Sequence, residues 1–149
     1  MNEQIKEIVK ENLITVSGVL HAPLELAWQA WTQPEHVTAW NFASIDWECP
    51  EATNDLRVGG EFHYAMAAKD GSFKFDFWGT HKDIQAHRRI ESELGDGRYM
   101  LVEFEAVSST QTKVTETFEP ESENPREMQQ GGWQAILENY CKHAESVNG

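Results

Sequence analysis

Residues 61–77, EFHYAMAAKDGSFKFDF, decide the fold class, because their apolar side chains recur at every second position on both sides of a turn. A period of two is typical of β-strands, in which successive side chains point to opposite faces. The Lys69-Asp70-Gly71 turn separates the two runs, so the stretch predicts a β-hairpin with one aromatic face. The residues predicted on that face are Phe62, Tyr64, Met66, Phe73, Phe75 and Phe77.

Four other stretches are predicted strands. Residues 13–19 are rich in β-branched side chains, and residues 90–94, 100–106 and 112–118 contain alternating apolar residues. Turn residues such as Gly95-Asp96-Gly97 separate the later strands. These short connections predict an antiparallel meander.

Two short helices are expected between the first strand and the hairpin. In residues 24–31 the apolar positions follow helical spacing, which places Trp28 and Trp31 on one face. Pro34 ends or kinks this helix, because proline removes a backbone donor and disfavours helical geometry in the residue before it. A second short helix is predicted from Val37 to about Trp40.

A long amphipathic helix is predicted at the end of the chain. Asn124-Pro125-Arg126-Glu127 has the pattern of a helix start, with an N-cap, a first-turn proline and an acidic third position. Gly131-Gly132 interrupts the helical pattern, because each interior glycine weakens a helix. The pair indicates close approach of the helix to a strand or to a bound ligand, a hinge, or a helix that begins only at Gly132. The apolar stripe of this helix contains Trp133, Ile136, Leu137, Tyr140, Cys141 and Ala144.

This element order predicts an α+β fold, in which a curved antiparallel sheet wraps around the long C-terminal helix. We expect one domain over residues 1–149, with a core of about residues 12–146. One face of the sheet needs a cover that only the last helix is long enough to supply. A cavity is expected between the sheet and the helix.

Composition excludes several classes of function. The formal net charge of -13 disfavours binding to nucleic acids and to anionic membranes. We find no signal-peptide pattern and no run that could span a bilayer, so we expect a cytoplasmic protein without membrane insertion. Cys49 and Cys141 have no metal-binding spacing and are expected to be reduced, packed thiols.

No sequence motif indicates a metal, a cofactor or a catalytic triad. The six histidines contain no HxH or HExxH pattern and are expected on the surface or in loops. Gly59-Gly60 lacks the rest of a nucleotide-binding fingerprint and is interpreted as a strand-entry turn or bulge. Asp55 and Arg57 either pair at a strand end or guard a cavity mouth.

Glu116 is the polar residue that strict alternation places on the apolar side of its strand. Alternation from Val114 to Phe118 directs its carboxyl group inward, where it needs a partner or a raised pKa. A bulge or register shift would instead turn it outward and direct Thr115 and Thr117 inward. An inward Glu116 is a candidate polar anchor for a ligand.

Several motifs together resemble the START-like, or SRPBCC, superfamily, which has the helix-grip (Bet v 1-like) fold. Within it, the chain is similar to the AHSA-type branch, named for activators of heat-shock-protein ATPase. The resemblance covers about residues 14–140. The motifs that carry it are Ala22-Pro23-Leu24-Glu25-Leu26-Ala27-Trp28, Trp31-Thr32-Gln33-Pro34-Glu35, Trp40, Asp55-Leu56-Arg57-Val58-Gly59-Gly60-Glu61-Phe62, Asp70-Gly71, Gly79, Thr112-Lys113-Val114-Thr115 and Gly132-Trp133.

The resemblance implies an internal cavity that binds a small, largely apolar molecule, with catalysis in only some branches. The co-chaperone that names the branch has an additional N-terminal domain, for which this sequence has no room, so chaperone activation is not expected. A cyclase, dehydratase or hydrolase using cavity residues such as Glu116 and Tyr64, a chaperone-interaction module and a homodimer remain alternatives. The predicted ligand-binding residues are Trp40, Phe42, Trp47, Phe62, Tyr64, Met66, Phe75, Phe77, Met100, Val102, Phe104, Glu116, Trp133, Ile136, Leu137 and Tyr140.

Overall fold

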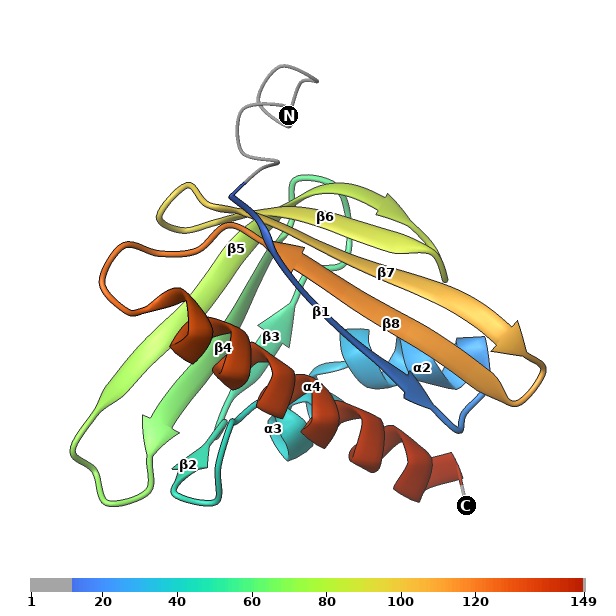
Figure 1. Cartoon of the computed structure of the whole chain (residues 1–149), viewed down its shortest axis with the longest axis horizontal. Helices are drawn as coiled ribbons and strands as arrows, with labels where there is room; N and C mark the ends of the chain where they lie inside the picture. Colours follow the sequence, from blue (N-terminus) through green and yellow to red (C-terminus); the bar gives the residue numbers. More distant parts are fainter. Residues whose placement is uncertain (1–11, 149) are drawn as a thin grey trace.

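The computed structural model describes residues 12–148, which form eight strands and three helices. Figure 1 shows the strands curling over the long C-terminal helix, with the two short helices beside it. In chain order the elements are β1 (Ile14–Leu20), α2 (Leu24–Thr32), α3 (Pro34–Trp40), β2 (Trp47–Glu48), β3 (Ala52–Asn54), β4 (Glu61–Ala68), β5 (Lys74–Gln85), β6 (Arg89–Leu94), β7 (Tyr99–Ser108), β8 (Gln111–Phe118) and α4 (Arg126–Asn148).

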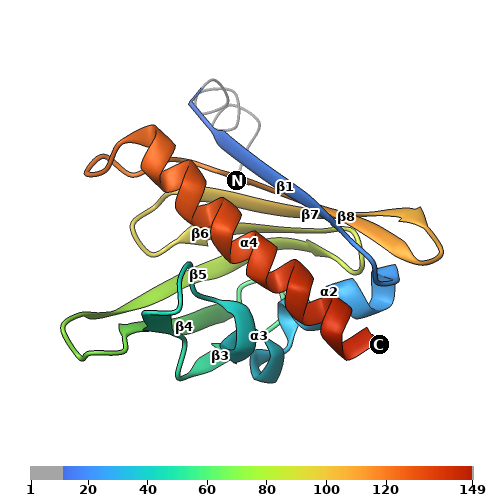
Figure 2. The same ribbon diagram turned by 60° about the horizontal axis from the view of Figure 1, so that its bottom comes forward.

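The strands form one antiparallel sheet in the order β1-β8-β7-β6-β5-β4-β2, and β3 also pairs with β4. From β4 to β8, strands adjacent in the sequence are adjacent in the sheet. The first strand then pairs with the last, with Ile14 opposite Phe118 and Leu20 opposite Thr112. Figure 2 shows α4 crossing the concave side of this sheet, beside β1. The predicted α+β helix-grip fold is confirmed.

The boundary between α2 and α3 lies at Gln33, which is extended at φ -84° and ψ 126°. Pro34 follows as the first residue of α3, and the residue before a proline avoids helical geometry. Trp28 and Trp31 are both buried, as their helical spacing predicts. The two rings pack edge-on against Phe104 of the sheet.

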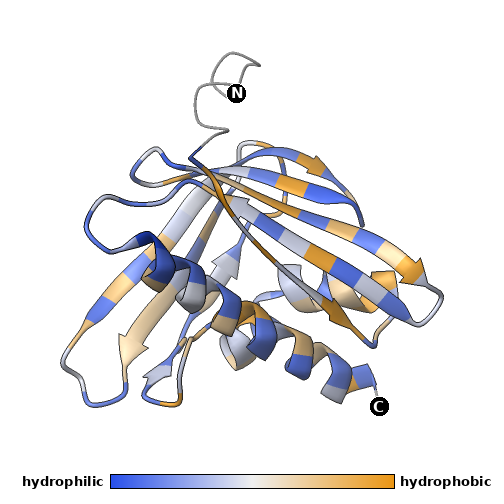
Figure 3. Ribbon diagram, viewed as in Figure 1, coloured by the Kyte–Doolittle hydropathy of each residue, from blue (hydrophilic) through white to orange (hydrophobic). Residues whose placement is uncertain are grey.

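Alternating burial in the sheet separates a core face from an outer face. Figure 3 shows hydrophobic and hydrophilic residues alternating along β7 and β8. In β7, Val102 and Phe104 are buried while Glu103 and Glu105 are exposed, as predicted. In α4, Leu137, Tyr140 and Ala144 are fully buried.

Helix α4 runs without interruption from Arg126, so it does not begin at Gly132. A Cβ added at Gly131 or Gly132 would meet nothing within 4 Å. The alternative that these glycines permit close approach of α4 to a strand is therefore wrong, because a Cβ at either position would lie in open space. Asn124 donates its side-chain amide to Glu121, and the carbonyl of Pro125 accepts the first helical hydrogen bonds.

The loop before β4 contains the Gly59-Gly60 pair. Gly59 has a φ of +88°, and Gly60 leaves no room for a Cβ, which would lie 2.1 Å from the carbonyl oxygen of Asp55. Both glycines form backbone hydrogen bonds with His81, as a strand-entry turn requires. Asp55 and Arg57 form an exposed ion pair of 2.8 Å across this turn. No helix within residues 12–148 combines the length and apolar composition that a bilayer crossing requires.

Candidate functional site

A cavity of about 330 Å³ lies between the concave face of the sheet and the N-terminal half of α4. Its walls come from α2, α3, strands β3 to β8 and α4, and most of the lining is apolar. Phe75, which is 42% exposed, and Asn124 place its opening between the β4–β5 hairpin and the start of α4. The predicted residues that line it are Trp40, Phe62, Tyr64, Met66, Phe75, Phe77, Met100, Val102, Glu116, Trp133 and Ile136.

Five predicted residues lie outside this lining. Phe104, Leu137 and Tyr140 are buried in the hydrophobic core and do not line the cavity. The Tyr140 hydroxyl donates a 2.6 Å hydrogen bond to the carbonyl of Ala27. Phe42 and Trp47 are half-buried, and Trp47 packs edge-on against the exposed Phe73 and Phe75 rings rather than into the cavity.

Glu116 points inward, as alternation along its strand predicts. It pairs with Val16 of β1 on one side and Val102 of β7 on the other, without a bulge. Its side chain is 4% exposed and lines the cavity. Within the described residues its Oε1 atom is buried and has no hydrogen-bond partner.

Burial raises the pKa of Glu116 from 4.5 to about 8. The cause is desolvation alone, because a carboxylate in an apolar cavity loses the water that stabilises its charge. At pH 7 the group is therefore mostly protonated. A neutral carboxyl group both donates and accepts hydrogen bonds.

A second polar cluster in the cavity wall joins Asn54, His81 and Ser92. Asn54 donates through Nδ2 to the carbonyl of Thr32 over 2.8 Å, so its Oδ1 must accept the 2.7 Å hydrogen bond from His81 Nε2. His81 Nδ1 is then unprotonated and accepts from the Ser92 hydroxyl over 3.4 Å. Burial lowers the pKa of His81, which favours this neutral form.

The location of His81 corrects the expectation that all the histidines lie on the surface or in loops. We followed the alternation only to Phe77, and the resemblance placed Gly79 in the same strand, but β5 continues to Gln85 and its register shifts only after His81. His81 therefore shares the inward face with Phe77 and Gly79. Extending the period of two through Gly79 would have identified it.

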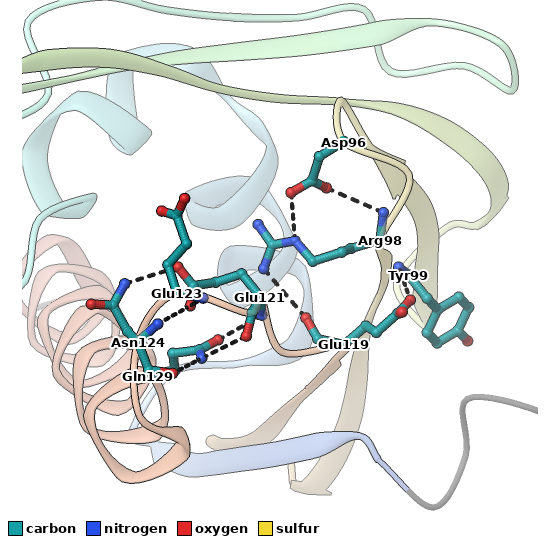
Figure 4. Close-up of polar contacts among 8 residues, drawn as sticks. All are labelled: Asp96, Arg98, Tyr99, Glu119, Glu121, Glu123, Asn124 and Gln129. Atoms are coloured by element: carbon teal, nitrogen blue, oxygen red, sulfur yellow. Dashed lines mark hydrogen bonds and ion pairs between the residues drawn. The ribbon is translucent and has the colours of Figure 1, made fainter.

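Polar side chains near the opening hydrogen-bond to the segment that connects β8 to α4. Figure 4 shows Gln129 beside Glu121 and Asn124 in this network. Its Nε2 donates to the carbonyls of Glu121 and Asn124, and its Oε1 accepts from the Glu121 amide. Across the opening, Arg98 donates to Asp96 over 2.7 Å and to the carbonyl of Glu119 over 3.3 Å. The sequence prediction identified none of these polar lining residues.

Metal binding has no support in the part of the chain that the structure describes. No group of three or more histidine, cysteine or acidic side chains is arranged to hold a metal ion. Both cysteines in this part are free. Burial raises the pKa of the Cys141 thiol to about 12, so it is protonated at neutral pH.

Several comparisons place this chain among known proteins. A solution structure of the AHSA1-like protein from Aeromonas hydrophila is 38% identical, with 90% of this chain and 94% of that chain covered and a TM-score of 0.81. A protein from Cytophaga hutchinsonii is 43% identical, with coverage of 91% and 94% and a TM-score of 0.78.

A more distant protein from Nitrosomonas europaea shares the fold at 20% identity, with coverage of 92% and 96% and a TM-score of 0.77. Among curated proteins, no relative matches this chain. The family model described as "Activator of Hsp90 ATPase homolog 1-like protein" matches residues 21–143, most of the sequence. This chain therefore belongs to the family of Activator of Hsp90 ATPase homolog 1-like proteins.

Proposed function

We propose that this protein binds a small, largely apolar molecule between its sheet and α4. The observation that carries the proposal is the apolar cavity of about 330 Å³, whose wall contains the buried carboxyl group of Glu116. Small-molecule sites are typically concave and mostly apolar, with volumes of roughly 300–1,000 Å³. A few polar groups in such a site fix the ligand's orientation.

The volume limits the size of the ligand, because it lies near the lower end of the range for small-molecule sites. The aromatic side chains of Trp31, Phe62 and Trp133 supply broad contact surfaces. Trp133 is fixed by stacking on Phe118, with ring centroids 3.7 Å apart. These walls favour a compact ligand with an aromatic or aliphatic body.

A second candidate function is proton-transfer catalysis by Glu116. The favouring observation is its pKa of about 8, because general acids and bases work best when their pKa lies near the operating pH. Mass spectrometry of a bound compound before and after incubation tests this candidate. A product with a changed mass or chromatographic retention time that Glu116→Gln does not form supports catalysis, whereas an unchanged compound supports binding alone.

Binding itself is tested with a cavity-filling variant and a matched control. Val102 lines the cavity, and Val107 lies on the same strand but is 53% exposed. Native mass spectrometry and a thermal-shift screen of aliphatic and aromatic compounds should identify ligands of the wild type, because ligand bound to the folded state raises stability. Val102→Phe should abolish their thermal shifts, and Val107→Phe should preserve them. Absence of a shift with every compound contradicts the proposal.

A further inference from the structure

Glu116 differs from the other polar groups in the cavity wall because no other described residue hydrogen-bonds its carboxyl group. Asn54, His81 and Ser92 satisfy one another, as their hydrogen bonds show. Asn41 donates to the Met66 sulfur over 3.1 Å. A molecule inside the cavity is therefore in position to supply the hydrogen-bond partner that Glu116 lacks among the described residues.

No cation of the described residues neutralises Glu116. The titratable side chains that face it from α4 are Tyr140 and Cys141, and burial raises both their pKa values, so both are neutral. In the cavity wall, burial lowers the pKa of His81, which favours its neutral form. Arg98 is already paired with Asp96, and Glu121 adds a further negative charge near the opening.

The cavity and the whole chain both favour a positive ligand. Aromatic faces attract cations, and the cavity is lined by Trp31, Trp40, Phe62, Tyr64, Phe77 and Trp133. The formal net charge of -13 attracts cations and repels anions over longer distances. An anionic amphiphile would bring a negative charge into a cavity in which no cation of the described residues balances it, and it would repel Glu116 whenever that group is ionised.

We propose that the ligand is a lipophilic amine, bound as its ammonium ion in an ion pair with Glu116. This inference rests on the proposed binding function and specifies its ligand class. The amine's apolar body fills the aromatic part of the cavity, and its N–H groups donate to the carboxylate oxygens.

Proton release distinguishes this complex from binding of a neutral hydrogen-bond acceptor. In the free protein at pH 7 the carboxyl group is mostly protonated, and the free amine is already an ammonium ion. Forming the ion pair moves the carboxyl proton to solvent. Affinity for an amine should therefore rise with pH up to about 8. A neutral ligand that accepts the carboxyl proton should bind more weakly as the pH rises through this range.

The test uses three probes with one carbon skeleton: 4-phenylbutylamine, 4-phenylbutan-1-ol and 4-phenylbutyrate. Isothermal titration calorimetry at pH 8 should show the amine binding about tenfold or more tightly than the alcohol, and the carboxylate most weakly. Between pH 6 and pH 8 the amine's affinity should rise by up to about tenfold per pH unit. Titration in two buffers of different ionisation enthalpy should show that protons are released.

Glu116→Gln preserves the side-chain shape and removes the charge. In this variant the amine should lose its preference and bind within about twofold of the alcohol, with no proton release. Glu105→Gln, on the solvent face of β7, is the matched control and should behave as the wild type. Tighter binding of the alcohol or carboxylate, or a preference for the amine that survives Glu116→Gln, overturns the inference while leaving the proposed function intact. Failure of all three probes overturns the amine inference alone if the thermal-shift screen identifies other ligands, and it overturns both proposals if the screen identifies none.

Discussion

The two halves of α4 pack in different ways. In the C-terminal half, Leu137, Tyr140 and Ala144 are fully buried against β1, α2 and α3. In the N-terminal half, Trp133 and Ile136 are only half-buried and line the cavity, while Gly131 and Gly132 face open space. The C-terminal half holds the helix on the sheet, and this attachment allows the other half to leave a cavity unfilled.

Hydrogen bonds reinforce the difference between these halves. Around the C-terminal half, Tyr140 donates to the carbonyl of Ala27, and Asn139 donates to the carbonyl of Phe42 over 2.6 Å. His36 and His143 share a hydrogen bond of 2.8 Å between α3 and α4. At the N-terminal end, Gln129 instead holds the chain preceding the helix. The contacts at that end therefore shape the opening of the cavity.

The largest expected effect concerns Glu116, in the strand beneath α4. Because its folded pKa of about 8 exceeds the ordinary value of 4.5, the folded state binds more protons between these values. Stability should therefore fall as the pH rises from about 4.5 to 8, by at most about 5 kcal/mol. Urea unfolding of Glu116→Gln should show a much smaller loss over this range. Parallel pH profiles for the two proteins would show that Glu116 is not the responsible group.

The next prediction compares two neighbouring residues of α4, one buried in the core and one that lines the cavity. Leu137→Ala should cost about 3 kcal/mol, because it opens a new cavity in a filled region. Ile136→Ala should cost only about 1 kcal/mol, because this side chain already borders empty space. Urea unfolding measures both losses. Equal losses would contradict the difference in packing between the two halves.

Sequence periodicity could predict the direction of a side chain but not the space beside it. Alternation from Val114 to Phe118 correctly turned Glu116 inward. The same kind of pattern placed Trp133, Ile136, Leu137 and Tyr140 on one helical stripe, yet only Trp133 and Ile136 border the cavity. An unfilled volume depends on how several elements pack together, which no single repeat in the sequence encodes.

The hydrogen-bonded groups in the cavity wall were harder to predict for a different reason. Asn54 lies in β3, which has only three residues, too few for a period to be recognised. Its contact with His81 joins residues far apart in the sequence. Such a pairing depends on the sheet register, which sequence patterns alone do not supply.

The smallest effect concerns Gly131 and Gly132, near the cavity opening in α4. Replacing both with alanine should stabilise the protein by about 1–2 kcal/mol, because alanine loses less backbone entropy on folding and the added Cβ atoms meet no neighbour. Packing does not explain the glycine pair, so we expect it to provide flexibility that admits the ligand. Stopped-flow tryptophan fluorescence should then show slower association and dissociation of a bound probe, with little change in its Kd. A stabilised double variant with unchanged rates would show that the glycine pair does not act as a hinge.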